Sequence, residues 1–379
     1  RAARAAGGVL GVAGRRRELG SPGGPDAIWR RRTQLAQPDG DDLRRHGDAM
    51  VPPGAADHAV NVIAGGPPDW LRDELRRALE EDAGAYPRED VARAAAGARH
   101  GRAAEEVVPT NGAAEAIWLL PPALRPRLAA CVHPGFTEAE AALRAHGIPV
   151  VRAMRDPSRN FALDPRAVPD EADLVVLANP GSPTGTLDPA AAVLALRRPG
   201  RVLAVDEAFM DLIPGEPGSL AGEALDDVIV IRSLTKSLAI PGVRAGYALA
   251  PPPLAARLRA VRPPWSAGAL ALAAIAAASA RPDAAALVAE RAQRERADLE
   301  RRLAGVAGVR VWPGAANFCL VEVPDGPAAL ARLGARGIAV RPCAGFPGLG
   351  PGHLRLTARG PEENRRLVEA LAEAVPAWA

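Results

Sequence analysis

The chain has 379 residues and a formal net charge of +3, because 47 basic residues face 44 acidic ones. The length is enough for a large core and two domains, and the near-balance of charges does not indicate nucleic-acid binding. The three cysteines fit neither a metal-binding spacing nor a disulfide framework, and the longest apolar stretch, 267–280, is too short to span a membrane. We therefore expect a cytoplasmic protein with no metal and with no nucleic-acid or membrane partner.

Residues 1–40 differ in composition from the rest of the chain. They hold eight arginines among glycine, proline and alanine, and they show no periodic apolar face. We expect a disordered basic extension, with a basic organelle-targeting signal as the alternative. Because the chain starts with Arg1, a fragment of a longer protein is a further alternative.

Two turns early in the main part of the chain follow apolar strands. Residues 107–118 have the pattern of a strand, a glycine turn and the start of a helix, and Phe136 lies just beyond a second strand. The first backbone N–H groups of a helix have no partner within it, and the helix dipole adds partial positive charge there. The turn at 111–112 is therefore a predicted phosphate-binding site.

Two further strands end in a polar residue. The apolar run 174–178 is followed by Asn179 and a proline–glycine turn, and the run 202–205 leads to Asp206. In open α/β sheets, ligands bind at the carboxyl edge of the strands. We expect Asn179 and Asp206 to meet at that edge.

Lys236 is the only lysine in the chain, although arginine is abundant. It follows the apolar run 228–231 in a turn that also carries Ser233 and Thr235, and Arg244 comes shortly after. An amine forms a Schiff base with an aldehyde, which a guanidinium does not, and the hydroxyls and the arginine fork suit a phosphate. The pattern predicts an aldehyde ligand that carries a phosphate, and the alternative is a chance surface lysine.

Helical and apolar-strand patterns alternate from residue 76 to 265, which predicts a parallel sheet flanked by helices. A pattern rich in alanine, arginine and glutamate runs from Ser266 to about Leu303 and predicts one long helix. Strands and a closing helix follow. Residues 266–379 are therefore expected to form a long connecting helix and a smaller α+β domain.

Five short motifs occur in a fixed order along the chain: Asn111-Gly112, Asn179-Pro-Gly-Ser-Pro183-Thr-Gly185, Asp206-Glu-Ala, Ser233-Leu-Thr-Lys236 and Arg244. This set resembles the fold-type I pyridoxal-phosphate enzymes of the class I/II aminotransferase family, over about residues 45–375. The resemblance implies an α/β fold, in which a large cofactor-binding domain (76–265) has a mostly parallel seven-stranded sheet between helices and a smaller α+β domain follows. Residues 41–75 would be an N-terminal arm that packs with the small domain.

The resemblance also implies roles for the residues at the strand ends. Lys236 would bind pyridoxal 5′-phosphate as a Schiff base and then act as general base and acid. Asp206 would pair with the protonated pyridine nitrogen, and Asn179 would donate a hydrogen bond to the phenolic oxygen. The alternatives are a helix-capping or otherwise paired aspartate and an ordinary turn asparagine.

Other residues would complete the cofactor site. By resemblance, the amides and side chains that bind the cofactor phosphate belong to Ala113, Ala114, Ser233, Thr235 and Arg244. Phe136 would stack on the pyridine ring, unless it is a core residue. Tyr86 would reach the cofactor phosphate of a partner subunit, unless it lies in an ordinary surface turn. The first interpretation of Tyr86 predicts a homodimer with shared active sites.

Three residues of the C-terminal part are candidate substrate contacts: Asn317, Arg341 and Arg355. Arg355 matches the family's arginine for the substrate carboxylate, and Arg341 matches an arginine that contacts a substrate phosphate in some subfamilies. A structural surface role is the alternative for Arg341. At Ile63-Ala64 relatives tend to have asparagine-proline, which weakens any transfer of substrate contacts from the arm.

Within the family, the chain looks nearest to threonine-phosphate decarboxylases of cobalamin biosynthesis and to histidinol-phosphate aminotransferases. Phe209, where aminotransferases commonly have tyrosine, and the stretch 341–349 favour a decarboxylase that acts on threonine phosphate. Two separated arginine clamps would also suit threonine phosphate, because it carries both a carboxylate and a phosphate. The alternatives are a histidinol-phosphate or other amino acid aminotransferase and a non-catalytic regulatory protein that binds pyridoxal phosphate.

Overall fold

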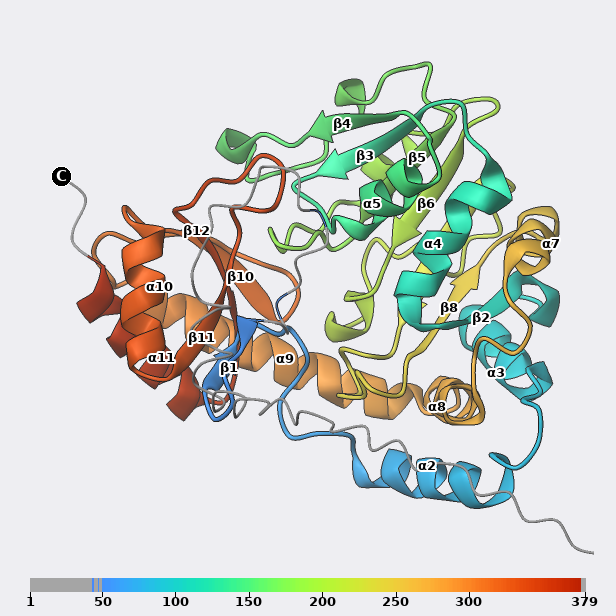
Figure 1. Cartoon of the computed structure of the whole chain (residues 1–379), viewed down its shortest axis with the longest axis horizontal. Coiled ribbons are helices and arrows are strands. Elements are labelled where there is room, and N and C mark those ends of the chain that lie inside the picture. The colour runs from blue at the N-terminus through green and yellow to red at the C-terminus, as the bar shows by residue number, and fades with distance from the viewer. Residues whose placement is uncertain (1–42, 44–46, 48–49, 376–379) are drawn as a thin grey trace, which may run out of the picture. The chain divides into compact units, whose positions relative to one another are not determined.

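The computed structural model describes residues 43, 47 and 50–375 (Figure 1). Backbone contacts divide the chain after Asp39, and Gly40–Ala379 form one compact unit that contains two β-sheets. The expected basic extension, 1–40, lies outside the described residues, as does most of the first part of the predicted arm.

The larger sheet has seven strands in the order β2-β8-β7-β6-β5-β3-β4. The strands are β2 (Val107–Asn111), β3 (Ala129–His133), β4 (Val150–Met154), β5 (Leu174–Ala178), β6 (Val202–Asp206), β7 (Val228–Ser233) and β8 (Ala245–Leu249). Pairing is parallel from β4 to β7, and β8 is antiparallel to both of its neighbours. The predicted mostly parallel seven-stranded sheet is confirmed.

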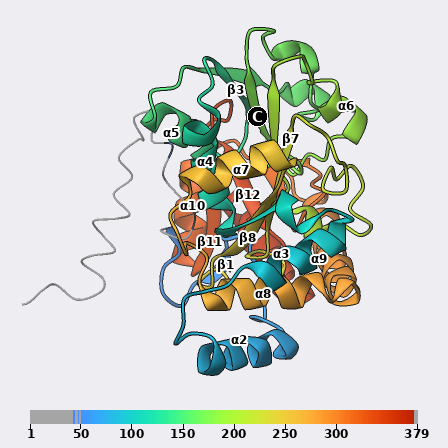
Figure 2. The ribbon, with the colours of Figure 1, turned by 90° about the vertical axis from the view of Figure 1, so that its right-hand side faces the viewer.

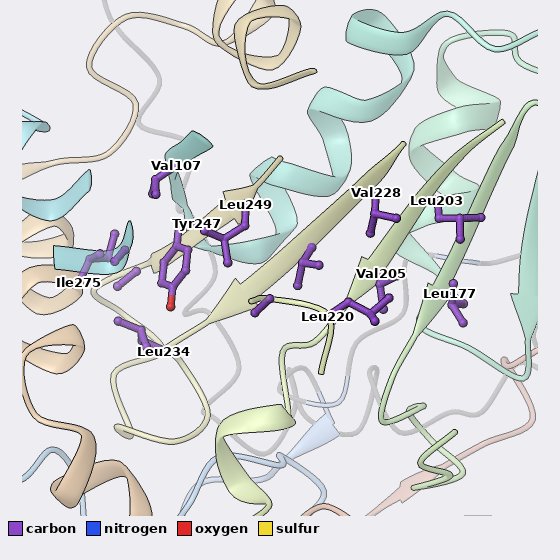
Figure 3. Packing of buried hydrophobic residues seen from close by; sticks show 14 of the residues in the cluster. Val107, Leu177, Leu203, Val205, Leu220, Val228, Leu234, Tyr247, Leu249 and Ile275 are labelled. Carbon is purple, nitrogen blue, oxygen red and sulfur yellow. The ribbon is translucent and has the colours of Figure 1, made fainter. Parts of the chain in front are cut away.

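Helices cover both faces of this sheet, which explains why its strands are apolar on both sides. Alternate strand residues, such as Val205 and Ala204, point to opposite faces and belong to different core clusters. One face packs on α3 (Asp90–His100) and α8 (Ala269–Ser279), which lie side by side in Figure 2. The other packs on α4 (Gly112–Leu124), α5 (Glu138–Ala145) and α7 (Pro252–Val261). Figure 3 shows the first of these cores, where Val205, Val228 and Tyr247 project from neighbouring strands.

The smaller sheet has five strands in the order β1-β11-β12-β10-β9. They are β1 (Ala56–His58), β9 (Arg310–Trp312), β10 (Phe318–Glu322), β11 (Ile338–Pro342) and β12 (His353–Thr357). All pairs are antiparallel except β1 with β11. Its apolar cluster includes residues of α9 (Pro282–Leu303), α10 (Gly326–Ala335) and α11 (Pro361–Ala374). The segment 41–75 contributes β1 to this sheet. It also contains the beginning of α2 (Asp69–Glu81), which continues beyond the segment.

The remaining elements are short: α6 (Ala190–Leu194) and the 3-10 turns η2 (Ala104–Glu106), η3 (Pro157–Arg159), η4 (Pro165–Ala167) and η5 (Met210–Leu212). They lie in connections between strands. The connection from β5 to α6 and the one through η5 both leave the carboxyl edge of the larger sheet.

The single long helix expected from Ser266 to Leu303 is wrong, because α8 and α9 are separate helices bent by 88°. Pro282 has no N–H to continue the helical hydrogen bonds, and it forces Arg281 out of the helical conformation, to φ −128° and ψ 65°. No single helix among the described residues combines the length and apolarity needed to cross a membrane, and the α8–α9 pair meets that test only by length and composition across its bend.

Candidate active site

Three neighbouring strands bring polar residues to the carboxyl edge of the larger sheet. In the register, Ala178 of β5 faces Asp206 of β6, which faces Ile231 of β7. The amide N–H of Asn179 donates to the carbonyl of Asp206 at 2.9 Å. Lys236 follows β7 in the next turn and is close enough to lower the pKa of Asp206 by its charge. The structure therefore brings together the Asn, Asp and Lys that the sequence places at strand ends.

Asp206 is a buried carboxylate whose ionised form is only partly stabilised by its neighbours. Burial is the main influence on it and raises its pKa to about 6, while the N–H of Ala208, 3.0 Å away, and the charge of Lys236 offset only part of that effect. A protonated pyridine nitrogen would supply the missing positive charge. Phe136 and Asp206 line the same small cavity, together with His133 and Ala178, so an aromatic ring and the carboxylate share one space.

The predicted phosphate-binding site, called the phosphate seat below, lies at the start of α4. A Cβ atom at Gly112 would lie 2.5 Å from Nη2 of Arg244, so the guanidinium rests directly against this glycine. A Cβ atom at Gly246 would lie 2.8 Å from the amide nitrogen of Ala113. Gly246 is in turn the cross-strand partner of Ser233. Glycine at both positions thus lets a helix N-terminus and an arginine approach the end of β7.

The hydroxyl residues of the seat are also in place. Ser233 and Thr235 are both buried, and the amide of Thr235 donates to Oγ of Ser233 at 3.3 Å. Ala114 lies in the first turn of α4 and is half-buried. A helix start, two hydroxyls and a guanidinium are donors that suit a phosphate, so this part of the site fits the phosphate of pyridoxal 5′-phosphate.

Asn179 has a fixed side-chain orientation that the sequence did not reveal. Its Oδ1 accepts from the backbone N–H of Asp188 at 2.8 Å, and its Nδ2 donates to the backbone carbonyl of the same residue at 3.0 Å. Flipping the amide would place like groups against each other at both contacts. Because Nδ2 has two hydrogens, a second donor is left for another acceptor, which is consistent with a bond to a phenolic oxygen.

The two predicted substrate arginines lie opposite each other. In the pairing of β11 with β12, Arg341 is the cross-strand partner of Arg355, and both are buried. Such a pair of like charges is unfavourable unless an anion lies between or beside them. The charge of Arg341 also lowers the pKa of Arg355, so the two cations lie close enough to interact. The expectation of two separated anion clamps stays a prediction.

Arg355 is held by neutral groups only. Its Nη1 donates to Oγ of Ser182 at 3.0 Å, its Nη2 donates to the carbonyl of Ala59 at 2.6 Å, and its Nε is buried with no hydrogen-bond partner. No carboxylate among the described residues forms an ion pair with it. Burial, and then the charge of Arg341, lower the pKa of Arg355 to about 10. The site thus contains a buried cation that makes no ion pair within the described part of the chain, and the charge of Asp57 offsets only part of the effect of burial on its pKa.

The predicted arm borders the site mainly through its backbone. The N–H of Ile63 donates to the carbonyl of Lys236 at 3.2 Å, and Nδ2 of Asn317 donates to the carbonyl of Asn61 at 3.2 Å. Asn317 thus holds the arm, while its Oδ1 is buried without a partner and can still accept a hydrogen bond. Because the contact at Ile63 uses main-chain atoms, the departure at Ile63-Ala64 does not prevent it.

Tyr86 lies at the surface and does not line the same space as these groups. Its side chain is 75% exposed and stacks on Trp265 with 4.4 Å between ring centroids. It lines a groove between α2, α3 and α8, and none of the other predicted site residues lines that groove. A role for Tyr86 in the site of a second subunit stays a prediction.

A buried charge cluster beneath the site was missed in the sequence. Arg232 of β7 is fully buried and pairs with Glu207, Asp211 and Glu216. Asp211 also accepts from Oγ of Ser237, at 3.2 Å. Glu207 follows Asp206 and Ser237 follows Lys236, so the cluster supports both turns. The only sequence signal was the presence of charged residues beside the motifs, and their partners come from other turns.

Comparison with known proteins agrees with this geometry. The family described as "Aminotransferase class I and II" matches residues 59–371. A histidinol-phosphate aminotransferase of Mycobacterium tuberculosis is 46% identical over 87% of this chain and 90% of that protein. A threonine-phosphate decarboxylase of Salmonella typhimurium is 35% identical over 72% of this chain and 78% of that protein.

Solved structures show the same fold. The histidinol-phosphate aminotransferase of Clostridium acetobutylicum superposes with a TM-score of 0.77, at 25% identity, over 84% of this chain and 98% of that chain. The chain therefore belongs to the class I and II aminotransferase family, has the fold-type I architecture, and is an enzyme that depends on pyridoxal 5′-phosphate.

Proposed function

We propose that the protein is an aminotransferase that acts on a phosphate-bearing amine of the histidinol phosphate type, with a 2-oxo acid as the amino acceptor. The relative named as a histidinol-phosphate aminotransferase shares more of its sequence with this chain than the one named as a threonine-phosphate decarboxylase, 46% against 35%. This order reverses the preference for the decarboxylase that Phe209 and the 341–349 stretch suggested.

The observation that carries the proposal is the adjacency of Arg341 and Arg355. Two neighbouring guanidinium groups can share one phosphate dianion, and the buried Nε of Arg355 offers a further donor. A substrate with a phosphate and no carboxylate can therefore satisfy both arginines. On this proposal, Arg355 binds the substrate phosphate together with Arg341 and needs no substrate carboxylate.

The remaining site residues bind the cofactor and move the proton at the substrate Cα. When bound, pyridoxal 5′-phosphate supplies an electron-withdrawing ring that stabilises negative charge at the substrate Cα. Lys236 holds the cofactor covalently and then moves the Cα proton as general base and acid. Asp206 keeps the pyridine nitrogen protonated, and Asn179 donates to the phenolic oxygen. The start of α4, Ser233, Thr235 and Arg244 bind the cofactor phosphate.

A threonine-phosphate decarboxylase is the second candidate. Phe209 favours it, because its ring is buried edge-to-face against Phe318, with 5.1 Å between centroids, and offers no hydroxyl to the cofactor. Both reactions begin when the amine of the substrate binds to the cofactor, and the bond to Cα that is aligned with the cofactor ring then decides whether a proton or carbon dioxide is lost.

Product analysis separates the two candidates. The holoenzyme is incubated with histidinol phosphate and 2-oxoglutarate, and separately with threonine phosphate, while glutamate and carbon dioxide are measured. We expect glutamate from the first mixture and no carbon dioxide from the second. Carbon dioxide from threonine phosphate without glutamate from histidinol phosphate would establish the decarboxylase instead. Turnover of neither, by a protein with bound cofactor, would contradict both candidates and favour a different amino acid as the substrate.

The assignment of Lys236 has an independent test. Borohydride reduction fixes a lysine-bound cofactor irreversibly, and Lys236 is the only lysine in the chain. Tryptic mapping of the reduced protein should find the cofactor on the peptide that contains residue 236, and Lys236→Ala should carry none. A reduced wild-type protein without label at this position would contradict the whole site.

We also propose that the enzyme is a homodimer whose subunits share their active sites. Support comes from large apolar side chains that are exposed around the groove of α2, α3 and α8: Leu79, Tyr86, Val91 and Trp265. Sedimentation velocity should show a dimer, and Val91→Glu should shift it toward monomer with loss of turnover. A fully active wild-type monomer would rule out shared sites.

A further inference from the structure

The 179–188 loop, which connects β5 to α6, contacts both ends of the site. At one end, the N–H of Asn179 bonds the carbonyl of Asp206. At the other, Ser182 accepts from Nη1 of Arg355, and the carbonyl of Gly185 accepts from the amide of Ala315 at 2.8 Å. The loop therefore spans from the larger sheet, which carries the cofactor residues, to the smaller sheet, which carries the substrate arginines.

Close packing fixes the loop against the smaller sheet. Gly185 has φ 73°, and a Cβ atom there would lie 2.6 Å from Cα of Gly314, so only glycine allows this approach. Inside the loop, the amide of Gly181 donates to the carbonyl of Thr186 at 2.8 Å. The loop can thus transmit the position of one end to the other.

Asp188 closes the loop by binding its first residue. The backbone N–H and carbonyl of Asp188 bond both polar atoms of the Asn179 side chain. The orientation of the Asn179 amide, and with it the direction of its remaining N–H, depends on where the backbone of Asp188 lies. A shift of Asp188 would therefore alter the proposed contact of Asn179 with the cofactor.

Arg155 holds Asp188 in place through a buried fork. Its Nη1 and Nη2 donate to the two carboxylate oxygens at 3.1 and 2.6 Å, and both side chains are only 2% exposed. Oδ1 of Asp188 also accepts from the amide of Leu163 at 2.9 Å, and Nη1 of Arg155 also donates to the carbonyl of Phe161 at 2.7 Å. A buried ion pair adds little net stability over apolar packing, but its two-bond geometry permits one arrangement only.

We propose that the Arg155–Asp188 pair is a positioning element shared by both ends of the site. It sets the 179–188 loop so that Asn179 faces the cofactor and Ser182 orients Arg355 for the substrate anion. The two ends are thereby coupled: a displaced Asp188 weakens both contacts together. This inference rests on the proposed roles of Asn179 and Arg355, and it does not depend on which phosphate-bearing amine is the substrate.

The test compares four variants of the holoenzyme with the wild type: Asp188→Asn, Arg155→Lys, Ser182→Ala and the control Asp164→Asn. Asp164 is the control because it is also an aspartate paired with arginines, Arg159 and Arg166, but its ion pairs lie at the surface. Three quantities are measured: the dissociation constant of inorganic phosphate, the pH midpoint of the cofactor's visible absorption band, and the melting temperature. The first reports on the arginines and the second on the donor at the phenolic oxygen.

Asp188→Asn should raise the phosphate dissociation constant about tenfold, which is the effect of losing one hydrogen bond to a charged group. It should also raise the pH midpoint. Without the hydrogen bond from Asn179, the phenolic oxygen carries more negative charge, and the Schiff base at Lys236 therefore holds its proton more tightly. Arg155→Lys keeps the charge but loses the fork, so both quantities should move in the same direction by less. Ser182→Ala should change phosphate binding alone, and Asp164→Asn should change neither.

Lowered melting temperature with both other quantities unchanged, in either Asp188→Asn or Arg155→Lys, would reduce the pair to a structural role and overturn the proposal. A change at one end only would disprove the coupling. If Asp188→Asn does not fold, Arg155→Lys decides by the same criteria. If Arg355→Met binds phosphate as well as the wild type does, the proposed substrate site is itself wrong, and the coupling fails with it.

Discussion

Two buried arginines in this protein have opposite surroundings. Arg232, on β7 of the larger sheet, is fully buried and pairs with three carboxylates. Burial alone would lower its pKa, but Asp211, Glu216 and Glu207 outweigh that effect and raise it well above its ordinary value. Arg355, on the smaller sheet, is 6% exposed and bonded to neutral groups, and burial together with Arg341 lowers its pKa to about 10.

The difference separates a structural charge from a functional one. A buried charge with its partners in place fixes the fold, and the Arg232 cluster does this for the turns that carry Asp206 and Lys236. A buried cation without a counter-charge is unfavourable in the empty protein, so its partner is best sought among the ligands.

Arg201 and Arg359 are also buried without an ion pair to any described residue, but backbone carbonyls accept from Nε and both Nη atoms of each. Arg355 differs because its Nε has no partner within the described part of the chain, so we place the anion site at Arg355 and its neighbour Arg341.

The largest expected effect is a loss of kcat on mutation of Asp206, a buried acid whose partner, like that of Arg355, is expected to be a ligand. Asp206→Ala removes the charge that keeps the pyridine nitrogen protonated, so kcat should fall by several orders of magnitude while some cofactor stays bound. Asp206→Glu should be milder. Steady-state kinetics and cofactor absorbance measure both quantities. Near-normal turnover of the alanine variant would show that Asp206 does not face the cofactor nitrogen.

Breaking the compensated cluster should cost stability. Arg232→Met leaves three carboxylates without their central cation, and we expect a loss of about 3–5 kcal/mol in the free energy of unfolding. Urea denaturation of the cofactor-free protein measures it. A loss below about 1 kcal/mol would mean that the cluster is not the structural support that its geometry suggests.

The raised pKa of Asp206 predicts a specific pH dependence. Because its pKa is about 6 in the folded protein against 3.8 for an ordinary aspartate, the folded state binds the extra proton between these values. The contribution of Asp206 to stability is therefore favourable at low pH and is lost as the pH rises from about 4 to about 6, by about 3 kcal/mol. The difference in unfolding free energy between cofactor-free wild type and Asp206→Asn isolates this effect. A flat difference across that range would contradict the assigned burial.

A smaller effect is expected for one partner of the arginine pair. Arg341→Ala should weaken binding of a phosphate-bearing substrate by about 1.5–3 kcal/mol, the usual contribution of a charged hydrogen bond. The preference for histidinol phosphate over histidinol, measured by competition, should fall accordingly. If the wild type binds the two equally, Arg341 does not belong to the site.

The parts of the fold and site that sequence could predict are local. The meeting of Asn179, Asp206 and Lys236 was predictable because parallel strands present their carboxyl ends at one edge. The turn from β2 into α4 was predictable from its glycine, while binding of a phosphate there stays a prediction. The break between α8 and α9 was missed because the alanine-rich pattern continues across Arg281–Pro282.

The parts that sequence could not predict depend on pairing over long separations. The adjacency of Arg341 and Arg355 follows from the register of β11 with β12, and Arg155 meets Asp188 across two connections of the larger sheet. No local pattern specifies such partners. The domain boundaries, the cytoplasmic location and the roles of Phe136 and Tyr86 stay predictions.

The most direct test of the central claim is the unfolding free energy of Arg355→Met, measured on protein with bound cofactor, with and without inorganic phosphate. Without phosphate, the variant should stay within about 1 kcal/mol of the wild type, because the loss of two hydrogen bonds is offset by removal of an uncompensated charge. With phosphate at ten times its dissociation constant, only the wild type should gain stability, by about 1.4 kcal/mol. A variant as unstable as Arg232→Met, or one that phosphate stabilises as much as the wild type, would contradict the claim.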